Sequence, residues 1–402
     1  MVRINDIHNY FIVLLLFVLT INTSAAYIVS AFIVIFWIAG GNFKHKLHMI
    51  FTDKLSLTFL ALFAIHLIGL LWTDSFDEGT KIASKQKLYI LAPLIISFFD
   101  KRFAKYAMFS LLGGVFVSEV YSLYLYFKFG LDSPGSLPSP FMHHMHYSLI
   151  LAFVFGYIIN EIEFKKIKDK KNLFYLSFAI LTIIVLFINK GRIGQVALLV
   201  VFFVLAVGKF RLSFIKSFVS VTLTTAMIFI FAYILSDQFK ERVDVANYEF
   251  SEVVGTGQRG SISCRFEMWN YATELGKKNP VIGVGTGDSI VEMTKLLGKD
   301  QFWKMFNDCG LGLKYQFNPH NNFLLFFMEF GIFGIVVLLF VLGCQFMIAY
   351  RLKSLPMAIL LSVTIVGMMT TSLISMHLKY MFFYTMVLTV LYFDALKKRS
   401  NI

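Results

Sequence analysis

Residues 322–350 read NFLLFFMEFGIFGIVVLLFVLGCQFMIAY, the longest apolar stretch of the sequence, with Glu329 as its one charged side chain. A helix needs about 20 apolar residues to cross a bilayer, so this stretch predicts a transmembrane helix. The rest of the chain has the same character. Of its 402 residues, 57% are apolar and 15% charged, against about 45–50% and 25% in soluble domains. The sequence therefore predicts an all-α polytopic membrane protein.

Apolar runs recur along the chain and predict about twelve transmembrane helices in all. They lie near 9–21, 25–40, 55–72, 88–99, 104–127, 146–160, 173–189, 193–208, 214–235, 322–350, 356–374 and 378–394. A break at Asn22-Thr23-Ser24 separates the first two, because one helix over 10–40 would be about 46 Å long. The chain thus divides into nine transmembrane helices within 1–235, a large loop at 236–321, and three helices with a short basic tail at 322–402.

Basic residues between these helices assign each loop to a side of the membrane. With the N-terminus inside, the short outside loops hold few basic residues, and the inside segments hold clusters: Lys44, Lys46 and Lys54; Lys101, Arg102 and Lys105; Lys165, Lys166, Lys168, Lys170 and Lys171; Lys209, Arg211 and Lys216; Lys397, Lys398 and Arg399. The positive-inside rule then places both termini in the cytoplasm and the large loop outside. The net charge of +13 orients the protein against anionic membrane lipids, and no nucleic-acid partner is needed to explain it.

The 236–321 loop is long, and loops of that length are usually functional. Two short helices are expected in it: Ser263–Leu275, capped by Gly276, and Asp288–Leu297, with Asp288 as its N-cap. The glycine-rich turn between them serves either backbone geometry or a backbone anion nest. Cys264 and Cys309 share the loop, and whether they form a disulfide stays open.

Basic side chains at the outer helix ends are candidates for chemistry. Lys190-Gly191-Arg192 interrupts apolar sequence there, either to anchor in headgroups or to grip a lipid-linked phosphate through the arginine fork. Arg265 opens the first loop helix. His320 lies in Asn318-Pro319-His320-Asn321-Asn322, where the loop re-enters the membrane and the asparagines can cap a helix. Glu329 follows about two turns further in, where a carboxylate is costly.

A metal site is disfavoured. His143 and His146 could share a helix face, but no carboxylate or cysteine lies within a few residues of them. No Asp-X-Asp motif stands at an outside helix end either, which argues against a metal-dependent glycosyl transfer. We therefore expect no metal and no other cofactor.

Several motifs in sequence order resemble the O-antigen ligase and O-antigen polymerase superfamily. The resemblance is strongest over about 190–335, and His146-Tyr147-Ser148-Leu149 is similar to a helix entry in some members. Many members have an aromatic residue shortly after the first arginine, where this chain has Ile193-Gly194-Gln195. The motifs are Lys190-Gly191-Arg192-Ile193-Gly194, Arg265-Phe266-Glu267-Met268-Trp269, Asn279-Pro280-Val281-Ile282-Gly283-Val284-Gly285-Thr286-Gly287, Pro319-His320-Asn321-Asn322-Phe323-Leu324 and Glu329-Phe330-Gly331-Ile332-Phe333-Gly334.

The resemblance implies a GT-C-like, metal-independent, inverting glycosyltransferase on the periplasmic face of the bacterial inner membrane. Its donor would be a glycan on undecaprenyl diphosphate, and its acceptor lipid A–core or a growing polysaccharide. Arg192 and Arg265 match family positions thought to hold the diphosphate, and His320 matches the histidine proposed to act on the acceptor. The expected substrate-binding residues are Lys190, Arg259, Gly285, Asn321, Asn322, Glu329 and His146.

Alternatives remain within the family and outside it. The twelve helices and one late loop favour a ligase, whereas a polymerase or a protein-glycosylating enzyme would share the donor and the fold. A lipid-linked sugar flippase or polysaccharide exporter should instead carry ionisable residues midway along its helices, and here most candidates lie at the outer interface. His320 is expected either to take the acceptor proton or only to orient the acceptor. The glycan and the oligomeric state are not fixed by the sequence.

Overall fold

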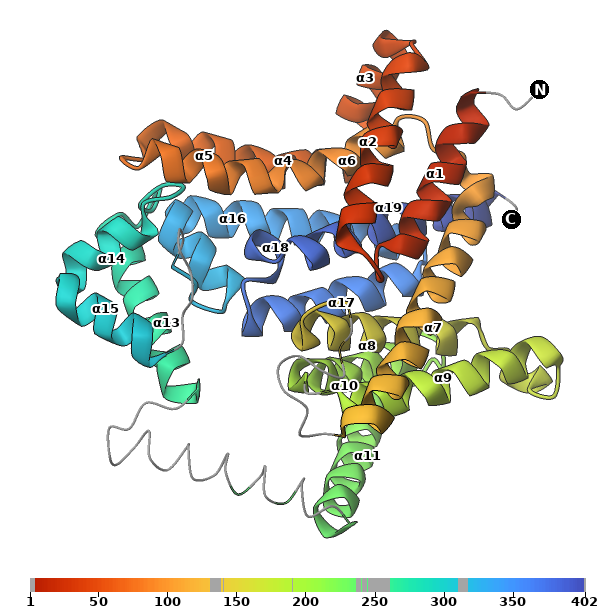
Figure 1. Cartoon of the computed structure of the whole chain (residues 1–402). Coiled ribbons are helices and arrows are strands. Elements are labelled where there is room, and N and C mark those ends of the chain that lie inside the picture. The colour runs from red at the N-terminus through yellow and green to blue at the C-terminus, as the bar shows by residue number, and fades with distance from the viewer. Residues whose placement is uncertain are drawn as a thin grey trace.

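The computed structural model of the chain describes residues 4–130, 141–189, 191–235, 261–309 and 317–400, together with 139, 240 and 244. All regular secondary structure in these residues is helical (Figure 1). The α-helices are α1 (Ile4–Val18), α2 (Thr23–Ala39), α3 (Phe43–Thr52), α4 (Lys54–Ile68), α5 (Phe76–Lys85), α6 (Leu91–Ile96), α7 (Ala104–Phe129), α8 (His144–Glu161), α9 (Lys170–Ile188), α10 (Arg192–Gly208), α11 (Phe214–Leu235), α13 (Ser261–Lys278), α14 (Ser289–Leu297), α15 (Lys299–Asp308), α16 (Asn322–Arg351), α17 (Leu355–Thr370), α18 (Leu373–Met376) and α19 (Leu378–Ser400). The 3₁₀ helices are η1 (Gly69–Trp72), η2 (Gln86–Ile90), η3 (Lys101–Phe103) and η4 (Phe164–Lys166).

The apolar runs of the sequence coincide with helices, and two of them are broken. The run at 88–99 divides into η2 and α6, because Pro93 fits only the first turn of a new helix. The run at 356–374 ends as α17 at Thr370, and the short α18 follows. These breaks give the chain more and shorter helical pieces than the hydropathy pattern predicts.

Four helical stretches of the described residues are long and apolar enough to cross a membrane: Lys54–Trp72, Lys101–Phe129, Lys170–Ile188 and Asn322–Arg351. α2 and α3 give a fifth candidate, bent by 120° between the two helices. Two other expected spans coincide with shorter helices; α10 has 17 residues and α17 has 16. By length and composition alone, four or five stretches of the described residues qualify as spans, and the number of twelve stays a prediction.

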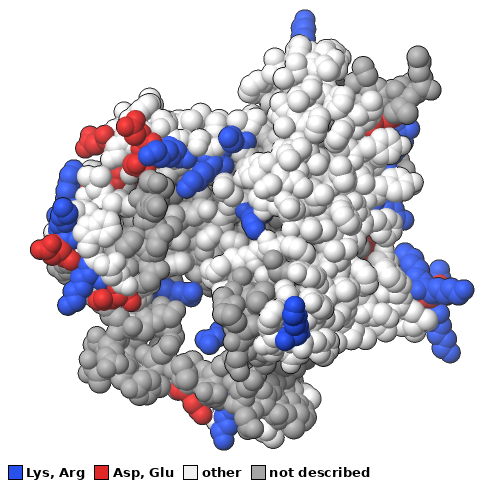
Figure 2. All heavy atoms as spheres, viewed as in Figure 1, with Lys and Arg blue, Asp and Glu red and all other residues white. Residues whose placement is uncertain are grey.

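The outer surfaces of the helices carry large apolar side chains. Leu71, Phe127 and Tyr350 are 83%, 80% and 81% exposed. Soluble monomers rarely expose contiguous apolar surface on this scale, whereas a lipid environment covers it. Figure 2 shows a broad expanse of uncharged residues between the basic groups at the right-hand edge and those on the left of the view. The protein is therefore a membrane protein, and the regular structure of its described residues is helical.

The core is built around α19. Its side chains are buried from Tyr380 to Leu391, and α6, α7, α17 and α18 pack against it. α10 contacts both α8 and α17, while α16 contacts both α4 and α17. The contacts between these apolar helices fix where the ends of α8, α10, α16 and α19 lie relative to one another.

α16 is broken near its N-terminal third, at Gly331. The φ of this residue is 62°, and its ψ of −152° is not helical. Beyond the break, the amides of Ile332 and Phe333 donate to the carbonyls of Pro280 and Val281, at 2.8 and 3.1 Å. A segment from the large loop thus supplies the acceptors that the preceding turn of α16 would have supplied.

The same segment, which we call the glycine turn (residues 280–287), also pairs with the other side of the break. The amides of Val284 and Gly285 donate to the carbonyls of Met328 and Glu329, both at 2.9 Å. A Cβ on Gly331 would lie 2.5 Å from the carbonyl carbon of the facing loop residue, so only glycine fits. The glycine turn is therefore built into α16.

The far end of the glycine turn packs against the corner between α4 and α5. Thr286 donates its amide to the Gly69 carbonyl at 3.2 Å and its hydroxyl to the His66 carbonyl at 2.9 Å. The Asp288 carboxylate accepts from the hydroxyl of Thr73 and from the amides of the next two residues, at 2.7–2.8 Å. The sequence predicted that the Asp288 side chain would accept a hydrogen bond from the first turn of its own helix, α14. No such capping bond forms, because the carboxylate accepts from Thr73 and the two residues after it instead.

Three helices of the large loop, α13, α14 and α15, pack together at one end of the molecule (Figure 1). α13 continues to Lys278, past the expected cap at Gly276, because the glycine lies against the ring of Phe327 and lets α13 approach α16. α15 was not expected from the sequence. Cys264 and Cys309 form a disulfide that ties α13 to the end of α15.

Candidate functional site

Four long helices begin in one region of the molecule. α8 and α10 meet near their N-termini, where a Cβ on Gly191 would lie 2.5 Å from Ser148 Oγ. α16 begins beside α18, joined by a hydrogen bond of Asn322. α8 and α19 meet through His146 and His377, whose ring centroids are 4.4 Å apart. Because each helix N-terminus carries partial positive charge, this region favours anions before any charged side chain is counted.

Arg192 is the first residue of α10, and it is exposed. Gly194, two residues further on, donates its amide to Ser148 Oγ at 3.1 Å, and a Cβ there would lie 2.5 Å from the Ser148 carbonyl carbon. Glycines on both sides of the arginine therefore let α10 close onto α8. The packing holds Arg192 beside the N-terminus of α8.

Arg265 lies in the first turns of α13 and is half-buried. Its neighbour Cys264 is buried and carries the disulfide, which fixes this end of the helix. Burial lowers the pKa of Arg265, and the positive charge of Arg192 lowers it further. The two arginines expected to hold a diphosphate are thus close enough for their charges to repel, which an anion between them would relieve.

His320 occupies a left-handed backbone conformation, with φ of 50°. Its amide donates to Asn318 Oδ1 at 2.9 Å, and Trp269 Nε1 donates to the carbonyl of Pro319 at 2.8 Å. Such conformations are held by their surroundings and concentrate at functional sites. Trp269 and Arg265 share α13, so the same helix that carries the arginine fixes the backbone of the histidine.

The His320 ring is neutral at pH 7 and has one nitrogen without a partner among the described residues. Its Nδ1 is buried and has no hydrogen-bond partner among the described residues. Burial, followed by the charge of Arg265, lowers the pKa of His320 to about 4. At neutral pH the imidazole is therefore uncharged and can accept a proton or a hydrogen bond.

The two asparagines after His320 anchor the start of α16. Asn321 Oδ1 accepts from the amides of Phe323 and Leu324 at 2.9 and 3.1 Å, so the expected N-cap is confirmed. Asn322 is buried and accepts from the amide of Ile374 at 3.1 Å. Both side chains are thus engaged in positioning the start of α16. A role in substrate binding would therefore be indirect.

Gly285 and Glu329 lie in the junction between the glycine turn and α16. The amide of Gly285 is taken by the Glu329 carbonyl, and the amide of Gly283 donates to Asn279 at 2.7 Å. The anion-nest alternative is therefore wrong for these two amides, which are used for packing. Glu329 is fully buried. Gly285 and Glu329, both expected to bind substrate, thus join the glycine turn to the first part of α16, which His320 precedes.

His377 belongs to the same region, although the sequence pattern did not predict it as a site residue. It lies between α18 and α19, and its Nε2 is 2.9 Å from Thr371 Oγ1. Burial, followed by the charges of His320 and His143, lowers its pKa to about 4. The feature of the sequence that could have indicated this residue is the pair of basic side chains, His377 and Lys379, between two apolar runs. We call Arg192, Arg265, His320, His377 and His146 the basic cluster.

Lys190 and Arg259 lie outside the described residues. In the part of the chain that the structure describes, no group of three or more His, Cys, Asp or Glu side chains is placed to hold a metal ion.

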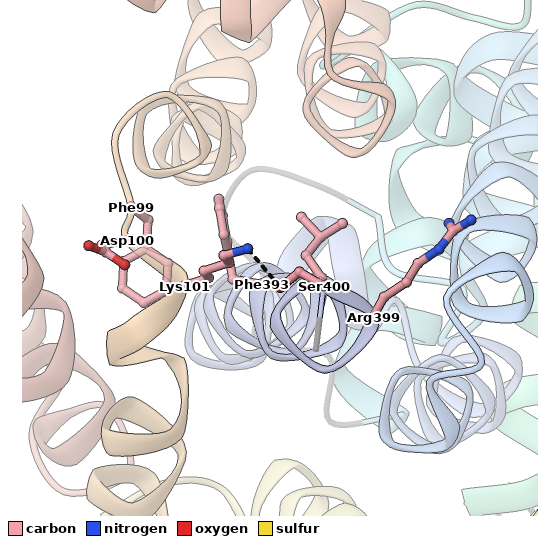
Figure 3. Close-up of a pocket in the computed structure, with 7 residues that line it drawn as sticks. Phe99, Asp100, Lys101, Phe393, Arg399 and Ser400 are labelled. Atoms are coloured by element: carbon pink, nitrogen blue, oxygen red, sulfur yellow. Dashed lines mark hydrogen bonds between the residues drawn. The ribbon is translucent and has the colours of Figure 1, made fainter. Parts of the chain in front are cut away.

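Two cavities lie away from the basic cluster. One of 540 Å³ lies between the start of α7 and the end of α19, where Lys101 Nζ donates to Ser400 Oγ at 2.8 Å and Arg399 points away from them (Figure 3). The other, of 550 Å³, lies along α3. Neither cavity is lined by a predicted site residue. We therefore identify the candidate site from the side chains of the basic cluster.

The model of a protein family described as O-antigen ligase matches residues 177–339. That range includes Arg192, Arg265, the glycine turn, His320 and the break in α16. No protein of curated function matches the chain. Over residues 177–339, this helical membrane protein is therefore similar to the O-antigen ligase family, and the resemblance of its motifs to the O-antigen ligase and polymerase superfamily is confirmed.

Proposed function

We propose that the protein is an O-antigen ligase that transfers a glycan from undecaprenyl diphosphate to a hydroxyl of lipid A–core. The reaction would invert the anomeric carbon, need no metal ion, and take place on the periplasmic face of the bacterial inner membrane. The observation that carries the proposal is the convergence of Arg192, Arg265 and His320 within the matched family domain.

The two arginines suit the donor. Displacement at the anomeric carbon releases a diphosphate, whose growing negative charge must be stabilised in the transition state. Arg192 and Arg265 lie close enough to interact, and guanidinium groups bind phosphate oxygens with paired charge-assisted hydrogen bonds. The helix N-termini of α8 and α10 add to the same positive potential. Together they would take the part that a metal ion plays in other glycosyl transfers.

His320 suits the acceptor. Its neutral ring could take the proton of the attacking hydroxyl as the new glycosidic bond forms, or hold that hydroxyl in line with the anomeric carbon. Diphosphate leaves readily, so orientation alone could supply much of the rate. Either role needs the ring beside the arginines, and α13 supplies that arrangement through Arg265 and Trp269.

The proposed topology has twelve spans, both termini in the cytoplasm, and the 236–321 loop in the periplasm. It is supported by the alternation of basic clusters along the chain and by the N-termini of α8, α10, α16 and α19, which lie together as helices entering from one side would. The same topology explains why the expected site residues belong to those helices or to the loop before α16.

A polymerase that joins repeat units is the closest alternative, because it would use the same donor and family domain. A flippase or exporter is more distant. It should carry ionisable groups around a path through the bundle; of the intramembrane carboxylates, Glu119 is bound to Thr182 at 2.7 Å and Glu329 lies beside the glycine turn.

The test is glycan transfer by the purified protein in liposomes, with undecaprenyl-diphosphate glycan as donor and EDTA present. We expect transfer to lipid A–core. Extension of a second donor molecule instead would identify a polymerase. Movement of the donor between leaflets without any transfer would overturn the enzyme proposal in favour of a flippase.

A further inference from the structure

His146, which is buried, and His377, which is half-buried, form a pair beside the proposed catalytic residues. Their ring centroids are 4.4 Å apart, and the rings are inclined by 57°. His146 lies in the first turn of α8 and His377 directly precedes α19, so the pair joins two helix N-termini. His143 extends the pair, with its ring centroid 5.7 Å from that of His146.

The His146 ring has no hydrogen-bond partner of its own. The residue is 6% exposed, and neither of its ring nitrogens bonds to any group among the described residues. A buried polar group that is left unpaired destabilises the folded protein. A ring that is only structural would be expected to find a partner, so the two free nitrogens point to a ligand that supplies one.

The ionisable groups that act on the pair are all basic, although the histidines among them are neutral at pH 7. His143, His144 and Lys379 act on His146, while His320 and His143 act on His377. No carboxylate is among them. Neutral imidazoles can donate hydrogen bonds to an anion such as a phosphate group and can become charged when it binds, and Lys379 adds a positive charge beside them.

Acids on the helices of the pair and on their neighbours are bound elsewhere. Glu161 of α8 and Asp394 of α19 lie 3.7 and 2.8 Å from Lys398, and Glu119 of α7 accepts from Thr182. The other elements that pack closely on α8 and α19 contain no acidic residue, and their ionisable groups are Lys87, Tyr89, Lys101, Arg102, Lys170, Lys171, Tyr175 and Arg192.

We propose that His146 and His377 bind a phosphate group next to Arg265 and His320, and that the pair takes up a proton as the phosphate binds. The proposal deepens the function proposed above and rests on it for the source of the phosphate, which is either the diphosphate of the donor or a phosphate on the acceptor.

The proton uptake follows from the surroundings of the pair. Without a ligand, burial and basic neighbours keep the pKa of His377 near 4, so the ring is neutral at pH 7. A bound phosphate brings negative charge and raises that pKa towards neutrality. Two charged rings 4.4 Å apart would repel each other, so we expect the pair to gain one proton rather than two. Binding should therefore strengthen as the pH falls.

The test is calorimetric titration of the full-length protein in detergent with inorganic pyrophosphate, in buffers of different ionisation enthalpy. Their comparison gives the number of protons taken up. His377→Gln and His146→Gln keep an amide for hydrogen bonding but cannot be protonated. We expect each to take up about one proton fewer than wild type and to bind pyrophosphate about 10- to 100-fold more weakly near pH 6. His48→Gln, an exposed histidine of α3, is the matched control and should behave as wild type.

Proton uptake by the wild-type protein tests the proposal even where a variant does not fold. Proton uptake by wild type no larger than the ionisation of pyrophosphate itself requires would overturn the proposal. So would folded His146→Gln and His377→Gln variants that bind pyrophosphate, and phosphate as a second ligand, like wild type.

Two further titrations separate the possible outcomes. Loss of pyrophosphate binding in the variants would assign the pair to the donor diphosphate. Loss only of inorganic phosphate binding to pyrophosphate-saturated protein would assign it to an acceptor phosphate. If wild type transfers no glycan but shows the proton-linked binding, the proposed function fails and the histidine pair stands. If wild type transfers glycan and both variants bind phosphate as it does, the proposed function stands and the histidine pair fails.

Discussion

His320 combines a left-handed backbone, a buried Nδ1 without a partner among the described residues, and a ring kept neutral by burial and by Arg265. Those features suit a group that orients the acceptor or takes its proton, which is the role we propose for His320. The histidine should therefore govern turnover, while the arginines govern donor affinity.

We predict that His320→Ala reduces turnover by about 10²- to 10⁴-fold, because an alanine can neither take the acceptor proton nor hold its hydroxyl. Donor binding should stay near the wild-type value. The measurement is kcat and donor Kd for wild type, His320→Ala and His320→Gln, with His48→Ala as control. Substantial rescue by the glutamine would assign orientation, since an amide still accepts a hydrogen bond. A large loss of donor binding in His320→Ala with full turnover would contradict the assignment.

At the scale of elements, the break in α16 shows why a glycine there is needed. Gly331 has a φ of 62°, and its added Cβ would lie 2.5 Å from the backbone of Val281. An alanine therefore meets both an unfavourable conformation and a backbone clash, which flexible side chains cannot relieve. The junction holds the glycine turn and the start of α16, and with it His320.

We predict that Gly331→Ala destabilises the protein by about 1–3 kcal/mol or prevents its folding. Gly343→Ala in the same helix is the matched control, because an added Cβ there meets no atom within 4 Å. It should leave stability unchanged or slightly raised. Thermal unfolding in detergent gives the comparison. Equal melting temperatures for the two variants would show that the glycine turn does not need this close approach.

At this scale the sequence predicted only features that depend on residues close together in the chain. The cap at Asn321 and the helical runs follow from neighbouring residues, and the structure confirms both. The partner of Asp288 is more than two hundred residues away in sequence, and the disulfide depends on where α15 ends. His377 joins the cluster only because α8 and α19 begin side by side. Single-sequence patterns contain no information about such pairings, so these features had to come from the fold.

For the molecule as a whole, the account depends on one orientation in the membrane. The N-termini of α8, α10, α16 and α19 must face the same side as α13, and the basic tail after α19 must face the other. We predict that a reporter fused after Gly298, between α14 and α15, is periplasmic, and that one fused after Lys168 is cytoplasmic. A fusion after Lys353, between α16 and α17, is the control and should be cytoplasmic. Reporters at Gly298 and Lys168 on the same side would break the topology.

The central claim is that an arginine pair holds a diphosphate without a metal ion, and donor binding to Arg265→Lys in EDTA tests it most directly. Lysine keeps the charge of Arg265 but loses the planar fork that bonds two phosphate oxygens. Arg351→Lys, at the exposed far end of α16, is the matched control. We predict that wild type and Arg351→Lys bind undecaprenyl-diphosphate glycan equally in EDTA, and that Arg265→Lys binds it about 10- to 100-fold more weakly. Wild-type affinity in Arg265→Lys, or loss of wild-type binding in EDTA, would contradict the account.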